Sequence, residues 1–162
     1  MPSTLHDFTV RANDGSEVAL SVYRDRVLLV VNTASRCGFT PQYAALETLH
    51  RRYATRGFAV LGFPCNDFMR QDPGTDEEIR TFCSTHYDVT FPLFARIRVR
   101  GTDAEPLYAW LTHDSAFPGA IGWNFAKFLA GRDGAIAERF EPATDPLDPR
   151  VVAAIEALLP AA

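Results

Sequence analysis

Cys37 stands where a buried strand should meet the start of a helix. Residues 27–31 are five consecutive aliphatic side chains, a pattern typical of a strand that is buried on both faces. Thr40 and Pro41 follow, and they are suited to cap the next helix and to open its first turn. The free N–H groups and the positive dipole end of a helix N-terminus favour a thiolate over a thiol. We therefore expect Cys37 to be a reactive nucleophile rather than a structural cysteine.

Two more cysteines, Cys65 and Cys83, make the count odd, so the thiols cannot all pair within the chain. Cys65 follows a proline at a predicted strand end, where a packing role is expected, although it is also a candidate partner for Cys37. Cys83 lies on a predicted helix, three residues before His86. Because no second pair of ligands has suitable spacing, we expect no metal site, and nothing in the sequence predicts a cofactor.

Length and charge limit the classes of protein to which the chain can belong. Its 162 residues are expected to form a single domain over residues 1–162. The net charge of −4 argues against nucleic acid or an anionic membrane as a partner. No apolar run approaches the ~20 residues of a membrane span, and the N-terminus lacks the basic and apolar parts of a secretory signal. We therefore expect a cytoplasmic protein, in which a disulfide would be transient and catalytic.

The elements that would position Cys37 begin with a β-hairpin and a βαβ unit. An Asp-Gly pair at residues 14–15 separates two short apolar runs, which predicts the hairpin. A buried strand over residues 27–32, a helix over about 41–54 and a second buried strand over 58–63 come next. This order predicts two parallel, neighbouring strands with a right-handed crossover.

The loop over residues 64–74 leaves the carboxyl end of the second buried strand, so it should lie at the same sheet edge as Cys37. Thr75 and Glu78 form a capping box that opens a helix ending near residue 87. The rest of the pattern predicts, in order, a strand over residues 93–99, a helix after Pro106, a hairpin with strands at 125–129 and 136–140, and a helix from residue 148. Together these elements predict an α/β, thioredoxin-like fold, with a central mixed β-sheet flanked by helices and an N-terminal β-hairpin.

Three blocks of the sequence, spread over nearly the whole chain, resemble the signatures of the glutathione peroxidase family and occur in that family's order. They are Asn32-Thr33-Ala34-Ser35-Arg36-Cys37-Gly38-Phe39-Thr40, then Leu61-Gly62-Phe63-Pro64-Cys65-Asn66-Asp67-Phe68 with Gln71-Asp72-Pro73-Gly74, and Ile121-Gly122-Trp123-Asn124-Phe125-Ala126-Lys127-Phe128-Leu129. The resemblance implies a Cys-type peroxidase that reduces hydrogen peroxide and organic hydroperoxides, similar to the bacterial thioredoxin-dependent branch. Thioredoxins themselves carry a second cysteine where this chain has Thr40, so Cys37 needs a partner from another element.

The resemblance also implies a role for each matched residue. Cys37 would be the peroxidatic thiolate, and Gln71, Trp123 and Asn124 would complete the catalytic tetrad. Cys83 lies in the helix in which the thioredoxin-dependent members carry their resolving cysteine. The segment before Trp123 lacks the long insertion that builds the tetramer interface of some members, which implies a monomer or a weak dimer.

Peroxide reduction suits these residue types. The amides of Gln71 and Asn124 and the indole of Trp123 are neutral donors, which stabilise a thiolate and the charge on a leaving oxygen without adding a base. Attack on the peroxide leaves a sulfenic acid at Cys37, which can condense with Cys83 to a disulfide. Because that bond needs Cα atoms within roughly 7 Å of each other, we expect the helix over residues 75–87 to unwind partly in each cycle.

Several alternatives are compatible with the sequence. Thioredoxin is the expected reductant and glutathione the alternative, because no arginine or lysine clearly marks a glutathione site. A peroxide sensor that passes its disulfide to a partner protein is a further hypothesis, and both Cys83 and Trp123 could be core residues. Asp67 and Met69 stand where the family usually has glutamine and glycine, which leaves the conformation of that loop as a question for the structure.

Overall fold

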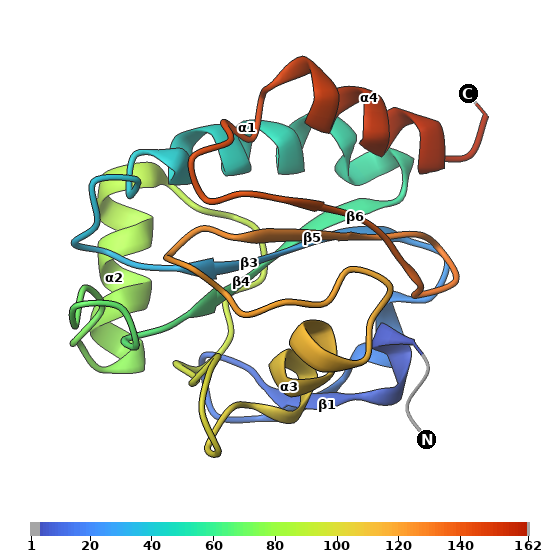
Figure 1. The fold of residues 1–162 in the computed structure, drawn as a ribbon. Coiled ribbons are helices and arrows are strands. Elements are labelled where there is room, and N and C mark those ends of the chain that lie inside the picture. The colour runs from blue at the N-terminus through green and yellow to red at the C-terminus, as the bar shows by residue number, and fades with distance from the viewer. Residues whose placement is uncertain (1–3, 162) are drawn as a thin grey trace.

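A four-stranded mixed sheet forms the centre of the computed structural model, which describes residues 4–161 (Figure 1). Its strand order is β4-β3-β5-β6, with β3 parallel to β4 and antiparallel to β5, and with β6 antiparallel to β5. The strands are β1 Thr9–Arg11, β2 Glu17–Ala19, β3 Val27–Thr33, β4 Phe58–Pro64, β5 Lys127–Ala130 and β6 Ile136–Phe140. The α-helices are α1 Gln42–Tyr53, α2 Asp76–Tyr87, α3 Pro106–His113 and α4 Pro149–Leu158, and short 3₁₀-helices are η1 Leu5–Asp7, η2 Leu20–Tyr23 and η3 Ala54–Arg56.

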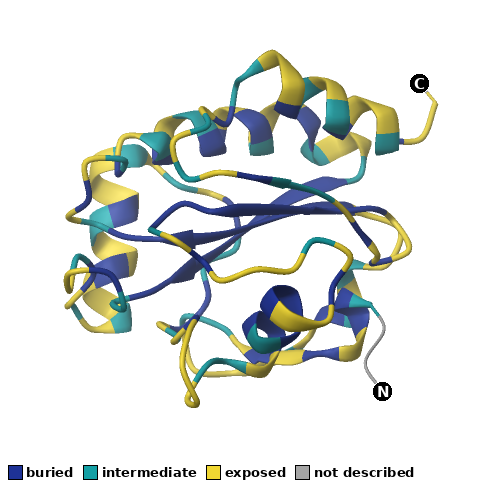
Figure 2. Cartoon of the chain, in the orientation of Figure 1, coloured by how far each residue is buried: buried dark blue, intermediate teal, exposed yellow. Residues whose placement is uncertain are grey.

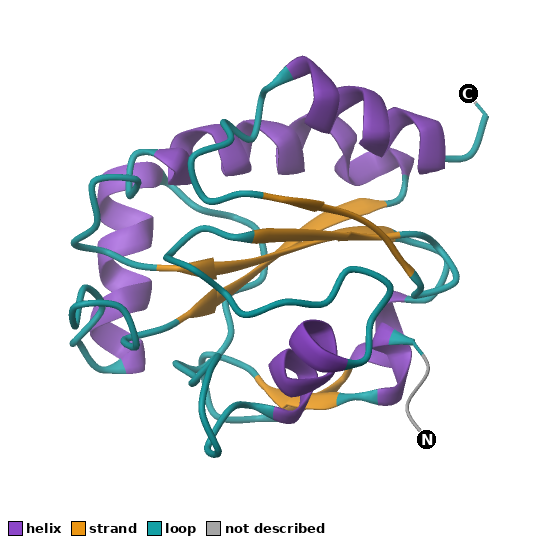
Figure 3. Cartoon of the chain, viewed as in Figure 1, coloured by secondary structure: helices purple, strands orange, loops and turns teal. Residues whose placement is uncertain are grey.

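Helices cover both faces of the sheet. Figure 1 shows α1 and α4 on one face, and α3 with the β1–β2 hairpin on the other, while α2 stands at the edge toward which β3 and β4 point. Figure 3 separates the strands of the sheet from these helical layers by colour. The predicted βαβ unit, the mixed sheet and the N-terminal hairpin are therefore all present. Among the described residues, no helix is both long and apolar enough to cross a membrane.

The aliphatic run of β3 lies at the centre because it supplies side chains to two separate cores. Val27, Leu29 and Val31 pack in the cluster under α1 and α4, which we call the α1-side core. Leu28 and Val30 pack in the cluster under α3, which we call the α3-side core. Figure 2 shows the central strands buried along their length. A strand with apolar residues at every position is thus explained by burial on both faces.

The predicted strand over residues 93–99 is wrong as a continuous strand. This segment makes only isolated bridges, to Gly62 within β4, to Cys65 just after β4 and to Ala12 just after β1. The Phe94 N–H bonds to the Gly62 carbonyl at 2.9 Å, whereas the next N–H, of Ala95, bonds to the Arg11 carbonyl at 2.9 Å. Because successive N–H groups serve different partners, the segment joins the sheet edge to the N-terminal hairpin and forms no ladder with either.

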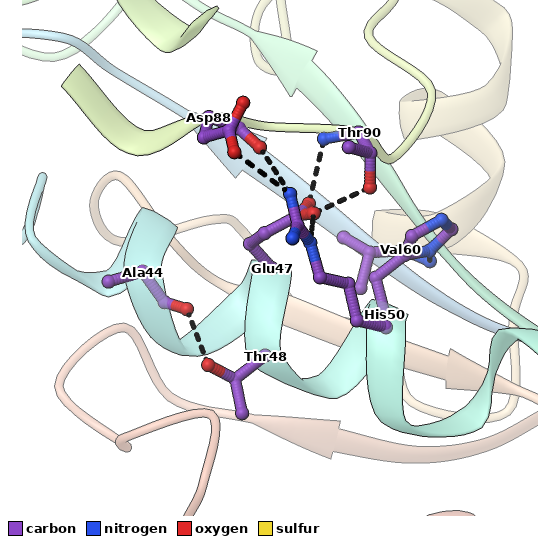
Figure 4. A network of polar contacts seen from close by, with 8 residues as sticks. Ala44, Glu47, Thr48, His50, Val60, Asp88 and Thr90 are labelled. Atoms are coloured by element: carbon purple, nitrogen blue, oxygen red, sulfur yellow. Dashed lines mark hydrogen bonds and ion pairs between the residues drawn. The ribbon is translucent and has the colours of Figure 1, made fainter. Parts of the chain in front are cut away.

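A buried carboxylate connects α1 to the segment that follows α2 (Figure 4). Glu47 is 5% exposed, and it accepts hydrogen bonds from the backbone N–H of Thr90, at 2.8 Å, and from the Thr90 hydroxyl. Arg51 pairs with Glu47 and also donates to the Asp88 carbonyl oxygen at 3.1 Å. The C-terminal end of α2 is therefore fixed to α1, while the N-terminal end of α2 is held by its own Thr75–Glu78 capping box.

Candidate active site

Cys37 lies in the turn between β3 and α1, with its thiol facing two N–H donors. The indole Nε1 of Trp123 donates to Cys37 Sγ at 3.3 Å, and the backbone N–H of Phe39 donates to the same sulfur at 3.3 Å. The residue is 8% exposed, so these donors act where solvent screening is low. Donors aimed at sulfur stabilise a thiolate more than a thiol, so these contacts suit a nucleophile, and the reactive role of Cys37 stays a prediction.

The Thr40 side chain shapes this turn instead of capping α1, which corrects the sequence prediction. Its hydroxyl accepts a hydrogen bond from the Cys37 N–H at 2.9 Å and donates to the Ala34 carbonyl at 2.8 Å. The cap position of α1 belongs to Pro41, whose side chain makes no cap hydrogen bond. Thr40 lies two residues before the first residue of α1, and both hydrogen bonds of its hydroxyl are made within the turn. Its hydroxyl therefore fixes the backbone that carries the thiol.

Trp123 reaches Cys37 because the end of β3 holds the turn that precedes β5. The side-chain amide of Asn32 donates to the Trp123 carbonyl at 3.1 Å, and the Phe125 N–H donates to the Asn32 carbonyl at 2.6 Å. Asn32 is fully buried. We did not single out Asn32 from the sequence, although a polar residue ending a buried aliphatic run was a usable signal. Its two contacts set Trp123 beside the thiol.

Gln71 and Asn124 meet at the same edge of the sheet. The Asn124 side-chain amide donates to Gln71 Oε1 at 3.0 Å, although the two residues are 53 positions apart in sequence. Since the Gln71 side-chain oxygen accepts this bond, the NH₂ group of Gln71 is the end of the amide that can donate to a further partner. The structure thus brings Cys37, Gln71, Trp123 and Asn124 to one place, with a direct bond to sulfur from Trp123.

Asp72, next to Gln71, fastens the loop before α2 to the turn of Cys37. Its Oδ1 accepts hydrogen bonds from the Ser35 N–H at 3.2 Å and from the Ser35 hydroxyl at 2.7 Å. Beside it, the Arg36 N–H donates to the Gln71 carbonyl at 2.8 Å. The Asp72 side chain is fully buried. Sequence reasoning missed this residue, because a carboxylate in a polar loop gives no sign of burial.

Replacing Asp72 by asparagine should remove a pH-dependent penalty on folding. Burial raises the pKa of Asp72 from 3.8 to about 6, against the lowering effect of its bonds with Ser35. The folded protein then binds more protons than the unfolded chain between these pH values. Its free energy of unfolding should therefore fall by on the order of 3 kcal/mol as the pH rises from about 4 to about 6.

Asparagine keeps an acceptor for Ser35 but does not ionise, so Asp72→Asn should gain stability relative to wild type over that same pH interval. Urea unfolding of both proteins at a series of pH values measures this difference. Asp103→Asn, at a side chain that is 76% exposed, is the matched control and should show no such gain. A stability difference between Asp72→Asn and wild type that is constant with pH would contradict the assignment.

Asp67 anchors the loop that carries Gln71. Its side chain is 6% exposed and accepts hydrogen bonds from Arg98 Nε at 3.1 Å and from the Val99 N–H at 2.8 Å. Arg100 adds a bond of 2.7 Å to the Asp67 backbone carbonyl. Met69, two residues later, has a left-handed φ of 57° and is 77% exposed. The unusual carboxylate is therefore paired, and the methionine occupies the backbone conformation that glycine would adopt most easily.

Cys83 lies in the α1-side core together with Cys37, and its side chain is fully buried within α2. Burial raises the pKa of the Cys83 thiol to about 11. A groove of about 210 Å³, lined by Ser35, Phe82 and neighbouring residues, separates the Cys37 turn from α2. The two cysteines are free. The movement of α2 that a disulfide between them requires stays a prediction.

Cys65 is placed less well to react with Cys37. It belongs to the α3-side core, on the other face of the sheet from Cys37 and Cys83. Burial raises the pKa of the Cys65 thiol to about 12. Its side chain is fully buried, and this position favours a packing role.

Within residues 4–161, no cluster of three or more histidine, cysteine, aspartate or glutamate side chains is placed to hold a metal ion.

Comparison with known proteins finds similarity over most of the chain. Residues 5–112 match the family described as glutathione peroxidase. The glutathione peroxidase homolog BsaA of Halalkalibacterium halodurans is 48% identical over 146 residues, which are 89% of this chain and 93% of that protein. The thioredoxin/glutathione peroxidase BtuE of Escherichia coli is 42% identical over 181 aligned positions, covering 98% of this chain and 99% of BtuE.

Solved structures agree with the predicted fold. The crystal structure of Trgpx in its apo form superposes with a TM-score of 0.74 at 38% identity, over 96% of this chain and 97% of Trgpx. A thioredoxin-family thiol:disulfide interchange protein from Chlorobium tepidum, at 15% identity, superposes with a TM-score of 0.66 over 98% of this chain and 97% of that one. The second likeness concerns the fold alone, and the two together confirm the thioredoxin-like arrangement.

Proposed function

The chain belongs to the glutathione peroxidase family and is a peroxidase, and we propose that Cys37 is the thiol with which it reduces hydroperoxides. The observation that supports this most directly is the pair of N–H donors, from Trp123 and Phe39, on the Cys37 sulfur. We further propose that Gln71 and Asn124 act with Trp123 as the donors around the reacting oxygen. The bond of Asn124 to Gln71 orients the Gln71 amide for that role.

In the first step the Cys37 thiolate attacks one peroxide oxygen. A sulfur–oxygen bond forms as the oxygen–oxygen bond breaks, so the thiol is oxidised to a sulfenic acid while the other oxygen leaves as hydroxide or alkoxide. The leaving oxygen takes up a proton and becomes water or an alcohol. The neutral donors of Trp123, Gln71 and Asn124 stabilise negative charge on this oxygen while it develops.

In the second step we propose that the Cys83 thiol attacks the sulfenic sulfur. A disulfide forms, and the sulfenic oxygen leaves as water after it takes up the thiol proton. Cys83 is favoured over Cys65 because it shares the α1-side core with Cys37. A dithiol protein then reduces the disulfide and is itself oxidised. The name of BtuE, thioredoxin/glutathione peroxidase, supports thioredoxin as this reductant and keeps glutathione as the alternative.

The same proposal extends to the context in which the enzyme works. We propose that residues 1–162 form one thioredoxin-like peroxidase domain that acts in the cytoplasm as a monomer or a weak dimer. One central four-stranded sheet with a core on each face supports one domain. The hydroperoxide and a thiol reductant are the only partners that this chemistry needs.

Turnover with purified reductants tests the proposed function. With thioredoxin, thioredoxin reductase and NADPH, the protein should consume many equivalents of hydrogen peroxide or of an organic hydroperoxide. Replacing the thioredoxin system by glutathione and glutathione reductase should give much slower turnover. A peroxide sensor would stop after about one equivalent in both assays, and fast turnover with glutathione alone would assign the enzyme to the alternative reductant.

A further inference from the structure

A fully buried lysine lies just behind the turn that carries Trp123 and Asn124. Lys127 is the first residue of β5, opposite Val31 of β3, and its side chain has no exposed surface. Its Nζ donates to three backbone carbonyls: that of Phe125 at 2.7 Å, that of Pro142 at 3.2 Å and that of Glu141 at 3.4 Å. An ammonium group has three N–H bonds, so this arrangement satisfies its charged form completely.

The backbone that Lys127 holds has an unusual conformation. Phe125 has a φ of 70°, a left-handed value that a bulky side chain adopts only when its surroundings impose it. Its N–H bonds to the Asn32 carbonyl at 2.6 Å, while its own carbonyl accepts the bond from Lys127. Its ring is fully buried, with an edge contact of 5.6 Å between its centroid and that of Tyr43. Both polar groups of Phe125 are thus held, one from β3 and one from Lys127.

This conformation sets the direction of the two residues before it. Asn124 bonds to Gln71, and Trp123 bonds to the Cys37 sulfur at 3.3 Å. A peptide rotation at Phe125 would turn Asn124 and Trp123 away from these partners, and an error of about 1 Å in a catalytic contact can lower a rate by two orders of magnitude. The contact between Lys127 and Phe125 is therefore placed to affect the reaction without touching the peroxide.

We propose that Lys127 is a positioning residue for peroxide reduction, whose ammonium group holds the Phe125 carbonyl and so fixes the turn that aims Trp123 and Asn124 at Cys37. This proposal rests on the proposed function of Cys37. Lys127 otherwise stands in the sequence only as one residue of the third family signature. Its signal in the sequence is a charged residue where the flanking strand positions are apolar.

The charge on Lys127 makes the role testable by pH. Burial lowers the pKa of Lys127 to about 7, and the charges of Asp145 and Glu141, in the segment after β6, raise it against that effect. The residues opposite Lys127 in the sheet, Val31 of β3 and Phe140 of β6, are uncharged, and so is Gln42 of α1, which donates to the Pro142 carbonyl that Lys127 also bonds. As the pH rises through about 7, the neutral amine keeps two N–H bonds for three carbonyls. The hold on Phe125 should weaken in that interval.

Lys127→Met, which keeps the length of the side chain without its donors, is the direct variant. Reduced protein is mixed with hydrogen peroxide, quenched, and analysed by mass spectrometry for oxidised Cys37 at a series of pH values. At low pH, where the ammonium is intact, wild type should oxidise Cys37 at least about tenfold faster than Lys127→Met does. This ratio should shrink as the pH rises through about 7. Because both proteins are compared at each pH, the ratio reports how much Lys127 contributes to the reaction of Cys37 at that pH.

Asp145→Asn provides a second variant that leaves Lys127 and the active site in place. Asparagine preserves the acceptor that Asp145 offers to the Leu147 N–H at 2.8 Å, but it removes the charge that raises the pKa of Lys127. The Lys127 ammonium should therefore be lost at a lower pH in Asp145→Asn, so the rate of Cys37 oxidation in this variant, relative to wild type, should fall in the interval just below about pH 7. This readout holds even if Lys127→Met fails to fold.

Two results would overturn the positioning role. One is a rate ratio that is constant with pH, because a purely structural lysine would lower the rate equally at every pH. The other is an Asp145→Asn profile that matches wild type. Failure of the proposed function looks different, since wild-type Cys37 would then stay reduced in peroxide at every pH.

Discussion

Replacing Cys37 by serine should lower peroxide turnover by at least about 1000-fold while leaving the fold unchanged. Serine has nearly the size of cysteine, so it fits the same buried position, which is 8% exposed, and the turn should keep its shape. The hydroxyl does not ionise near neutral pH, so the donors from Trp123 and Phe39 would have no anion to stabilise. The NADPH-coupled assay with thioredoxin measures the loss.

Cys65→Ser is the matched control for that experiment. Its thiol is also buried near the end of a strand, but it lies in the α3-side core, on the other face of the sheet from Cys37. We expect Cys65→Ser to retain thioredoxin-dependent turnover, with any loss limited to stability. Substantial turnover by Cys37→Ser, or complete loss in Cys65→Ser with an intact fold, would show that the peroxidatic thiol was assigned wrongly.

Replacing Cys83 by serine should separate the two halves of the cycle. The first half needs only Cys37 and its donors, so Cys37 should be oxidised at the wild-type rate. The second half has lost its nucleophile, so thioredoxin-dependent turnover should stop once each molecule has consumed one peroxide. Rapid-quench mass spectrometry follows the first half, and the coupled assay follows the second. A glutathione-dependent route, where present, should survive in Cys83→Ser.

Full thioredoxin-dependent turnover in Cys83→Ser would contradict the proposed role of Cys83 as the resolving cysteine. The helix that carries Cys83 is held at both ends. Cys83 is fully buried in the middle of α2, the capping box of Thr75 and Glu78 closes one end, and the contacts of Glu47 and Arg51 fix the other. We therefore predict that partial unwinding of α2 begins between these two anchors, near the groove lined by Ser35 and Phe82.

The fold was largely predictable because its strongest signals are local. An aliphatic run with every position apolar identified β3, and the strand–helix–strand order fixed the parallel pairing of β3 with β4. The segment over residues 93–99 has an equally strand-like composition, yet its N–H groups bond to acceptors on several different segments, namely the carbonyls of Gly62, Arg11 and Pro64 and the side chains of Asp76 and Asp67. Composition alone does not show where hydrogen bonds go, so that prediction failed.

The candidate site was predictable only in part, because its contacts join distant segments. The bond from Trp123 to Cys37 spans 86 positions, and no periodicity in the sequence encodes it. Family resemblance supplied Trp123, Asn124 and Gln71 as candidates, and the structure brings them together. Asp72 was missed because burial of a carboxylate in a polar loop depends on the surrounding backbone, which the sequence does not reveal. Lys127 was missed although the apolar residues on either side of it were a usable signal.

A single peptide map tests most directly whether Cys37 reacts with peroxide and Cys83 resolves it. Fully reduced protein is treated with one equivalent of hydrogen peroxide, free thiols are blocked, and the protein is digested without reductant. Mass spectrometry should find Cys37 linked to Cys83 by a disulfide and Cys65 blocked as a free thiol. Cys37 recovered as a blocked free thiol, or linked instead to Cys65, would contradict the proposed cycle.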